Sequence, residues 1–195
     1  MSSIYFITHP DVEIDAAIPV PEWRLSARGR QRMHSLLRQP WITHLGAVWC
    51  STERKAIDGA EIITAAIDTI PVRLVTLGEN DQSATGFLPK AEFESTADAF
   101  FARPHDSVRG WETAIDAQRR IIAAVTMVAA ASSFGRDVAI VSHGGVGALL
   151  LCWLKACPIS RTEDQPSGCG GHYFCFDSRD YTLRHGWISI DGPGL

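Results

Sequence analysis

The chain has 195 residues, of which 46% are hydrophobic and 21% are charged, and its formal net charge is −4. This length and composition predict one globular domain with a sizeable core. The small negative charge, without any basic stripe, argues against general nucleic-acid binding. Residues 1–8 lack a cationic start and their apolar run is short, so we expect no secretory leader and a cytoplasmic location.

The cysteines and the longest apolar run argue against a metal site and a membrane span. Reduced thiols are the simplest interpretation of the five cysteines, which are odd in number and form no C-x-x-C pair. The apolar run at residues 138–154 contains His143 and three glycines, a pattern that predicts a strand, a turn and a helix. We therefore expect no metal, no cofactor and no membrane partner.

Short β-like runs alternate with longer helical patterns along most of the chain. Strands are predicted at residues 4–8, 47–51, 72–77, 137–142, 172–177 and 181–190, the last two as a terminal hairpin. Helices are predicted at residues 25–39, 52–67, 91–102, 111–132 and 144–156, with Ser26 as an N-cap and Phe134-Gly135 closing the fourth. Alternating βα units favour a three-layer α/β/α sandwich around a mainly parallel sheet.

Residues 78–110 interrupt this alternation. They contain Gly, Pro, Phe and acidic residues with weak periodicity, apart from the helical pattern at 91–102. A long excursion within a compact α/β domain is usually functional. We expect it to be a lid or insert within a single domain that spans residues 1–195.

Side chains that can act on a phosphoryl group follow four of the predicted strands. His9, Arg54, Glu79 and His143 each stand at or just beyond a strand end. In an open α/β sheet, ligands bind outside the carboxyl ends of the strands, so these side chains are expected to share one crevice. Each alone has a structural explanation, such as a satisfied histidine or a surface charge. Their convergence favours a functional site.

Two imidazoles, a guanidinium and a carboxyl group suit phosphoryl transfer. Arginine offers phosphate a planar donor fork, and a neutral imidazole can attack phosphorus to give a phosphohistidine. A second, protonated histidine can stabilise the transferring group, and a carboxylic acid can protonate the leaving alkoxide. Gly144 and Gly145 begin a predicted helix, whose backbone N–H groups an anion could approach closely.

The ordered motifs resemble those of the histidine phosphatase superfamily, the phosphoglycerate mutase-like branch of α/β proteins. The family's opening Arg-His-Gly matches "FITHP" at His9, and its PL(S/T)xxGxxQ stretch matches "WRLSARGRQ". Its SSPxxRAxxTA stretch resembles "CSTERKAIDGA", which puts Arg54 at the phosphate-binding arginine. Its LxE acid matches Glu79, and its closing VSHGG is present in full around His143. A family GES segment with a downstream arginine resembles residues 110–112 with Arg119.

The resemblance implies a phosphoglycerate mutase-like fold and a phosphohydrolase. His9 would attack phosphorus, and Glu79 would protonate the leaving group and later activate water. The implied phosphate-binding residues are Thr8, Arg54, His143, Gly144 and Gly145. The substrate would be a small phosphomonoester, with a phosphoprotein less favoured because residues 78–110 would narrow the entrance.

Two departures from the family pattern bear on activity. Thr8 stands where the family has its first phosphate-binding arginine, and Pro10 replaces a glycine. Losing one transition-state donor typically costs on the order of 10²–10³ in rate. Arg24, Arg28 and Lys55 lie near the right segments to replace the arginine, although Arg28 and Lys55 read as surface charges.

The departures leave an alternative function open. The chain would then be a degenerate, weak or inactive member that binds a phosphorylated ligand or partner. The missing arginine at position 8 favours that alternative, whereas the presence of all four strand-end side chains argues against it. Asp11 and Glu13 add negative charge near the phosphate site unless they point away or meet a basic substrate. The oligomeric state is also open, and a homodimer formed through the terminal hairpin is one possibility.

Overall fold

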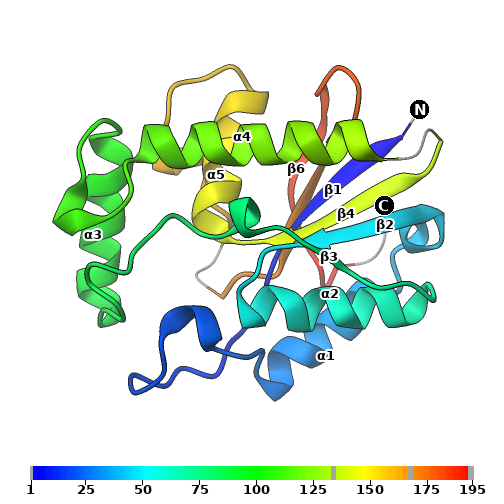
Figure 1. Cartoon of the computed structure of the whole chain (residues 1–195), viewed down its shortest axis with the longest axis horizontal. Coiled ribbons are helices and arrows are strands. Elements are labelled where there is room, and N and C mark those ends of the chain that lie inside the picture. Colours follow the sequence, from blue (N-terminus) through cyan, green and yellow to red (C-terminus); the bar gives the residue numbers. More distant parts are fainter. Residues whose placement is uncertain (1, 133–134, 167–168, 193–195) are drawn as a thin grey trace.

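A computed structural model describes residues 2–132, 135–166 and 169–192. Its sheet lies between two layers of helices (Figure 1). The strands are β1 (Ser3–Thr8), β2 (Leu45–Cys50), β3 (Val72–Arg73), β4 (Asp137–Ser142), β5 (His172–Asp177) and β6 (Leu183–Ser189). The α-helices are α1 (Ala27–Leu36), α2 (Arg54–Ala66), α3 (Lys90–Ala102), α4 (Ala114–Ala131) and α5 (Gly144–Leu154).

The sheet is mainly parallel, as predicted. Its strand order is β3-β2-β4-β1-β5-β6. The first four strands in this order are parallel neighbours, whereas β5 is antiparallel to both β1 and β6. The predicted terminal hairpin is therefore confirmed. Helices α1 and α2 cover one face of the sheet and α4 and α5 cover the other (Figure 1).

The central strand β1 shows why this sheet is buried on both faces. Ile4 and Phe6 point to the face that α4 and α5 cover, whereas Ile7 points to the face that α1 and α2 cover. Alternate residues of a strand point to opposite faces, so an uninterrupted apolar run serves two cores at once. Phe6 stacks on Phe174 of β5 with ring centroids 5.1 Å apart. This packing fixes the register of the strand whose end carries His9.

Hydrogen-bonding side chains set where two helices begin. Ser26 accepts a hydrogen bond from the Gly29 N–H at 3.1 Å, which confirms the predicted N-cap of α1. Thr113 caps α4 in the same way, so that helix begins at Ala114. Phe134, half of the pair predicted to close α4, lies outside the described residues, and Gly135 has a φ of +95°.

The third strand is shorter than predicted. β3 consists of Val72 and Arg73, the Leu74 N–H still donates to the Cys50 carbonyl of β2 at 2.9 Å, and the chain then forms a 3-10 turn that buries Leu77. Arg120 donates to the Thr76 and Gly78 carbonyls at 3.0 Å, and these bonds replace strand pairing. The edge strand therefore ends earlier than predicted, and the chain continues through the 3-10 turn into residues 78–110.

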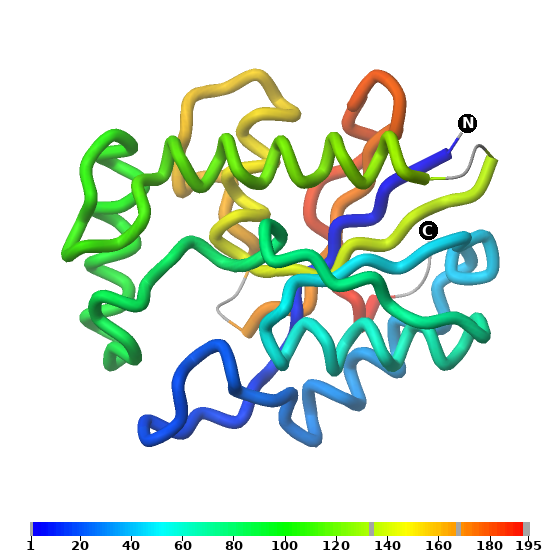
Figure 2. The backbone as a smooth tube through the Cα atoms, in the orientation of Figure 1, coloured from blue at the N-terminus to red at the C-terminus, as the bar shows by residue number. Residues whose placement is uncertain are grey.

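Residues 78–110 run past α5 to α3 and then back into α4, at one end of the sheet (Figure 2). An aromatic cluster anchors the segment: Phe100, Phe101 and Trp111 are buried and pack against Ala148 and Leu149 of α5. That this segment acts as a lid stays a prediction. Within the described residues, none of the helices has the length and apolarity needed to cross a membrane.

Candidate active site

The two predicted histidines lie side by side because β1 and β4 are adjacent and parallel. Thr8 pairs with Ser142 in the sheet, and a histidine follows each of them. The His9 N–H donates to the Ser142 carbonyl at 3.1 Å. The two imidazole ring centroids are 5.2 Å apart, edge to face. The carboxyl ends of these strands therefore bring His9 and His143 together.

His9 is held as a neutral imidazole beside a cavity. Its Nδ1 lies 3.0 Å from the Pro10 carbonyl oxygen, which can only accept, so Nδ1 carries the proton and Nε2 keeps its lone pair. Burial and the positive charge of Lys55 lower the pKa of His9 to about 4. His9 lines a cavity of about 510 Å³. An unprotonated ring nitrogen next to a cavity meets the requirements of a nucleophile.

His143 is fully buried behind His9. Its Nε2 lies 2.8 Å from the Ser51 hydroxyl and 3.2 Å from Oε1 of Glu53. The Ser51 hydroxyl can donate or accept, and within the described residues the buried Nδ1 has no hydrogen-bond partner. Burial lowers the pKa of His143 to about 3, although Glu53 acts in the opposite direction. His143 is thus a second neutral imidazole with an unused nitrogen.

A buried ion pair that the sequence analysis missed lies beside the histidines. Lys55 is only 4% exposed, and its Nζ contacts Oε2 of Glu53 at 2.6 Å and the Val20 carbonyl at 2.9 Å. Burial raises the pKa of Glu53, but His143, Lys55 and hydrogen bonds bring it down to about 2. The expectation that Lys55 is a surface charge is therefore wrong.

The structure does not bring Arg54 to the histidines. Its guanidinium pairs with Asp58 at 2.7 Å and approaches Glu61 at 3.7 Å, and it does not line the cavity. Successive helical residues differ by about 100° in direction, so residues 54 and 55 face different surroundings. Aligning the family's RAxxTA on Ala56 would have put Lys55 at the arginine position. The prediction of Arg54 rests on its being an arginine and ignores the direction in which residues 54 and 55 point from the helix.

Thr8 does not face the cavity either. It is 1% exposed, its hydroxyl donates to Oε1 of Gln165 at 2.6 Å, and it accepts from the His172 N–H at 3.0 Å. Its hydrogen-bonding capacity is used inside the protein, which corrects the expectation that Thr8 binds phosphate directly. Gln165 lines the cavity in its place.

Glu79 lines the cavity with Gly144 and Gly145, as the strand-end argument predicts. Its carboxylate accepts from the N–H groups of Gly145 at 3.0 Å, Val146 at 2.9 Å and Asn80 at 3.1 Å. It therefore caps the N-terminus of α5 and occupies the Gly145 donor that was expected to bind phosphate. Burial raises the pKa of Glu79, and the negative charge of Glu53 adds to this effect.

The resemblance also placed a downstream arginine one residue early. Arg119 is exposed and pairs with Asp116 at 3.2 Å. Arg120 instead binds Glu112, with its Nε and one Nη contacting the two carboxylate oxygens at 3.0 and 2.7 Å. Helix phase again decides which of two neighbouring residues points inward.

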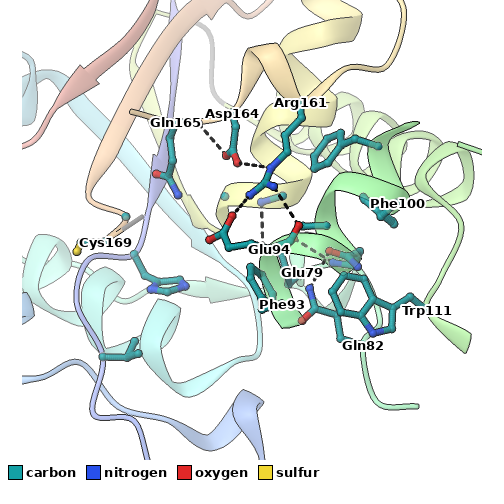
Figure 3. A pocket seen from close by; sticks show the side chains of 18 of the residues that line it. Glu79, Gln82, Phe93, Glu94, Phe100, Trp111, Arg161, Asp164, Gln165 and Cys169 are labelled. Carbon is teal, nitrogen blue, oxygen red and sulfur yellow. Dashed lines mark hydrogen bonds and ion pairs between the residues drawn. The ribbon is translucent and has the colours of Figure 1, made fainter. Parts of the chain in front are cut away.

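The cavity wall away from the sheet is aromatic and acidic (Figure 3). Phe93, Phe100 and Trp111 lie on one side of the cavity. Arg161 reaches in from the connection between α5 and β5, where it is bound by carboxylates from α3 and from Asp164. Across the described residues, no cluster of three metal-ligating side chains is present.

Comparison with known proteins agrees with this geometry. The family model of the histidine phosphatase superfamily (branch 1) matches residues 4–175. The chain belongs to the histidine phosphatase superfamily. A search of curated proteins gives no match.

Solved structures share the histidine phosphatase fold with this chain. Bacillus stearothermophilus YhfR is 23% identical, with a TM-score of 0.80 over 99% of this chain and 98% of that one. Mycobacterial glucosyl-3-phosphoglycerate phosphatase, in complex with inorganic phosphate, is 17% identical, with a TM-score of 0.77 over 99% and 100% of the two chains. The alpha-ribazole phosphatase of Shigella flexneri is 15% identical, with a TM-score of 0.67 over 99% and 98%. The predicted phosphoglycerate mutase-like fold is confirmed.

The buried pair gives this histidine phosphatase a testable feature. Lys55→Met would leave the Glu53 carboxylate buried beside a neutral site, and breaking such a pair costs about 3–5 kcal/mol. We expect a loss of that size in the free energy of unfolding, measured by urea denaturation. Glu53→Gln combined with Lys55→Met should recover part of it. Lys90→Met, at an exposed lysine, is the control. Equal effects of the two single lysine substitutions would contradict the burial of Lys55.

Proposed function

We propose that this chain is a phosphohydrolase that cleaves phosphomonoesters through a phosphohistidine on His9. The observation that supports this most directly is that Nε2 of His9 keeps its lone pair. His9 lines the cavity, and the neutral imidazole of His143 lies next to it, with ring centroids 5.2 Å apart. Membership of the superfamily agrees with this proposal, as do the named activities of phosphatases that share the fold.

The reaction would take two steps. In the first, Nε2 of His9 attacks phosphorus while the bond to the ester oxygen breaks, and Glu79 donates a proton to the leaving alkoxide. The raised pKa of Glu79 fits a proton donor. In the second step, the Glu79 carboxylate takes a proton from water, the oxygen attacks phosphorus and the nitrogen–phosphorus bond breaks. Inorganic phosphate leaves and the starting imidazole returns.

Lys55, rather than Arg54, would supply the positive charge for the phosphoryl group. Neither residue lines the cavity, but the charge of Lys55 lowers the pKa of both histidines, so it acts on the site. Lysine is a point charge without the planar fork of a guanidinium, and Glu53 offsets it. His143 would add to this stabilisation when it takes a second proton.

The cavity suits a small substrate whose alcohol portion carries no negative charge. Among the described lining residues, the one arginine or lysine is Arg161, which Glu94, Asp98 and Asp164 already share. A second phosphate or a carboxylate on the substrate would meet no spare cation there. The aromatic wall offers apolar contact instead. A phosphoprotein remains the less favoured substrate, and neither a nucleic acid nor a membrane is part of the proposal.

One observation favours a second function, a phosphate-binding member with little or no turnover. The position of the family's first arginine is neutral here, because Thr8 carries no charge. The remaining cation, Lys55, is matched by Glu53. A site with so little positive charge would stabilise a transition state less than the family pattern does.

Turnover and the trapped intermediate separate these two functions. We expect wild-type protein to hydrolyse an aryl phosphate faster than 3-phosphoglycerate, and to yield an acid-labile phosphoenzyme after an alkaline quench. His9→Ala should abolish both the turnover and the phosphoenzyme. His105→Ala, at an exposed histidine, is the matched control. Unchanged turnover in His9→Ala would refute the nucleophile assignment, and phosphate binding without any turnover would favour the binding function.

The pH dependence tests the state of His9. Because its pKa is lowered to about 4, the neutral nucleophile persists as pH falls through 6.5 and is lost only near pH 4. We expect kcat/KM, corrected for ionisation of the substrate, not to fall as the pH is lowered to about 5. Circular dichroism at each pH checks that the protein stays folded. A fall in kcat/KM centred near pH 6.5 would contradict the buried, neutral state of His9.

A further inference from the structure

The side-chain amides of Gln165 and Asn80 lie near Gly144 and Gly145, the first two residues of α5, and both residues line the cavity with His9. We propose that these two amides bind the phosphoryl oxygens of the substrate and that Thr8 positions Gln165 for this task. The inference rests on the proposed function and names the donors that act where a guanidinium is missing.

Thr8 fixes which way the Gln165 amide points. The Thr8 oxygen accepts from the His172 N–H at 3.0 Å, and its single hydroxyl proton has two acceptors in reach, Oε1 of Gln165 at 2.6 Å and the more distant His172 carbonyl at 3.2 Å. Its distance of 2.6 Å to the Gln165 amide is typical of an O–H···O bond and short for N–H···O. The atom facing Thr8 is therefore the amide oxygen, and the NH₂ group must face the other way.

The free NH₂ group of Gln165 lies over the first residue of α5. A Cβ atom placed on Gly144 would overlap Gln165 Nε2, so glycine is what allows the amide to stand there. Gln165 points into the cavity (Figure 3). Within the described part of the chain, Nε2 has no hydrogen-bond partner. The two N–H groups of the Gln165 amide are thus available next to Gly144, the residue that follows His143.

Asn80 supplies a second amide, next to the following residue of α5, Gly145. It is 4% exposed, and its Oδ1 accepts from Nε2 of Gln82 at 3.1 Å. Its Nδ2 is buried and has no hydrogen-bond partner among the residues that the structure describes. Its Oδ1 lies 3.2 Å from where a Cβ on Gly145 would stand. A buried donor without an acceptor is unfavourable, and a bound phosphoryl oxygen would satisfy it.

Neutral amides suit this particular location. The carboxylates of Glu53 and Glu79 lie close by, and each is held by its own donors. An amide is uncharged, so it can donate to an anionic oxygen without a carboxylate to balance it. Donors preorganised around the equatorial oxygens stabilise the transition state, and losing one typically costs on the order of 10²–10³ in rate.

The test measures binding of inorganic phosphate by titration calorimetry, and kcat and KM with an aryl phosphate. Gln165→Leu and Asn80→Ala should each raise the Kd for phosphate about tenfold or more and lower kcat by on the order of 10². Thr8→Val should give a smaller loss and add nothing to Gln165→Leu, because Thr8 acts through Gln165. Thr8→Ser, which keeps the hydroxyl, should restore wild-type values. Gln31→Leu, at an exposed glutamine on α1, is the matched control.

The outcomes separate this inference from the proposed function. If wild type turns over and a folded Gln165→Leu keeps its phosphate Kd and kcat, the inference is overturned and the phosphohydrolase stands. If wild type binds phosphate through Gln165 but forms no phosphoenzyme, the inference stands and the phosphohydrolase falls. If wild type neither binds phosphate nor turns over, both are overturned. Thermal melts confirm that each variant is folded.

Discussion

The pairing of β1 with β4 is the constraint on which the site depends. These parallel strands are in a register that opposes Thr8 to Ser142, so the next residue of each is a histidine. A slip of one residue would turn Phe6 and Ile7 to the wrong faces of the sheet. Because both faces are buried, core packing holds the register. Two imidazoles are thereby fixed 5.2 Å apart without any direct bond between them.

The Glu53 carboxylate organises the charges around those histidines. It accepts from the Glu79 N–H at 2.9 Å and contacts His143 at 3.2 Å and Lys55 at 2.6 Å. One side chain thus connects α2, α5 and the start of the segment that follows β3. The same carboxylate offsets the positive charge of Lys55. The site therefore carries little net positive charge, and the donor that we propose from Gln165 is a neutral amide.

Local patterns predict most of the fold and part of the site. The apolar runs gave the bounds of β4 and β5 and the alternation that sets the sheet, and strand ends identified His9, Glu79 and His143. The spacing of the family's RAxxTA stretch points to Lys55, but Arg54 is the arginine of that segment, and residue type alone therefore predicts the wrong ligand. Gln165 could not be found at all, because its bond to Thr8 joins residues 157 positions apart. Only the folded chain shows such a contact.

A crystal structure with orthovanadate, which adopts the trigonal bipyramidal geometry of phosphoryl transfer, tests the central claim most directly. We predict a vanadium atom bonded to Nε2 of His9, with its equatorial oxygens within hydrogen-bond distance of the amides of Gln165 and Asn80. Vanadate bound to Arg54 or Arg161 instead, with His9 Nε2 uncoordinated, would contradict it.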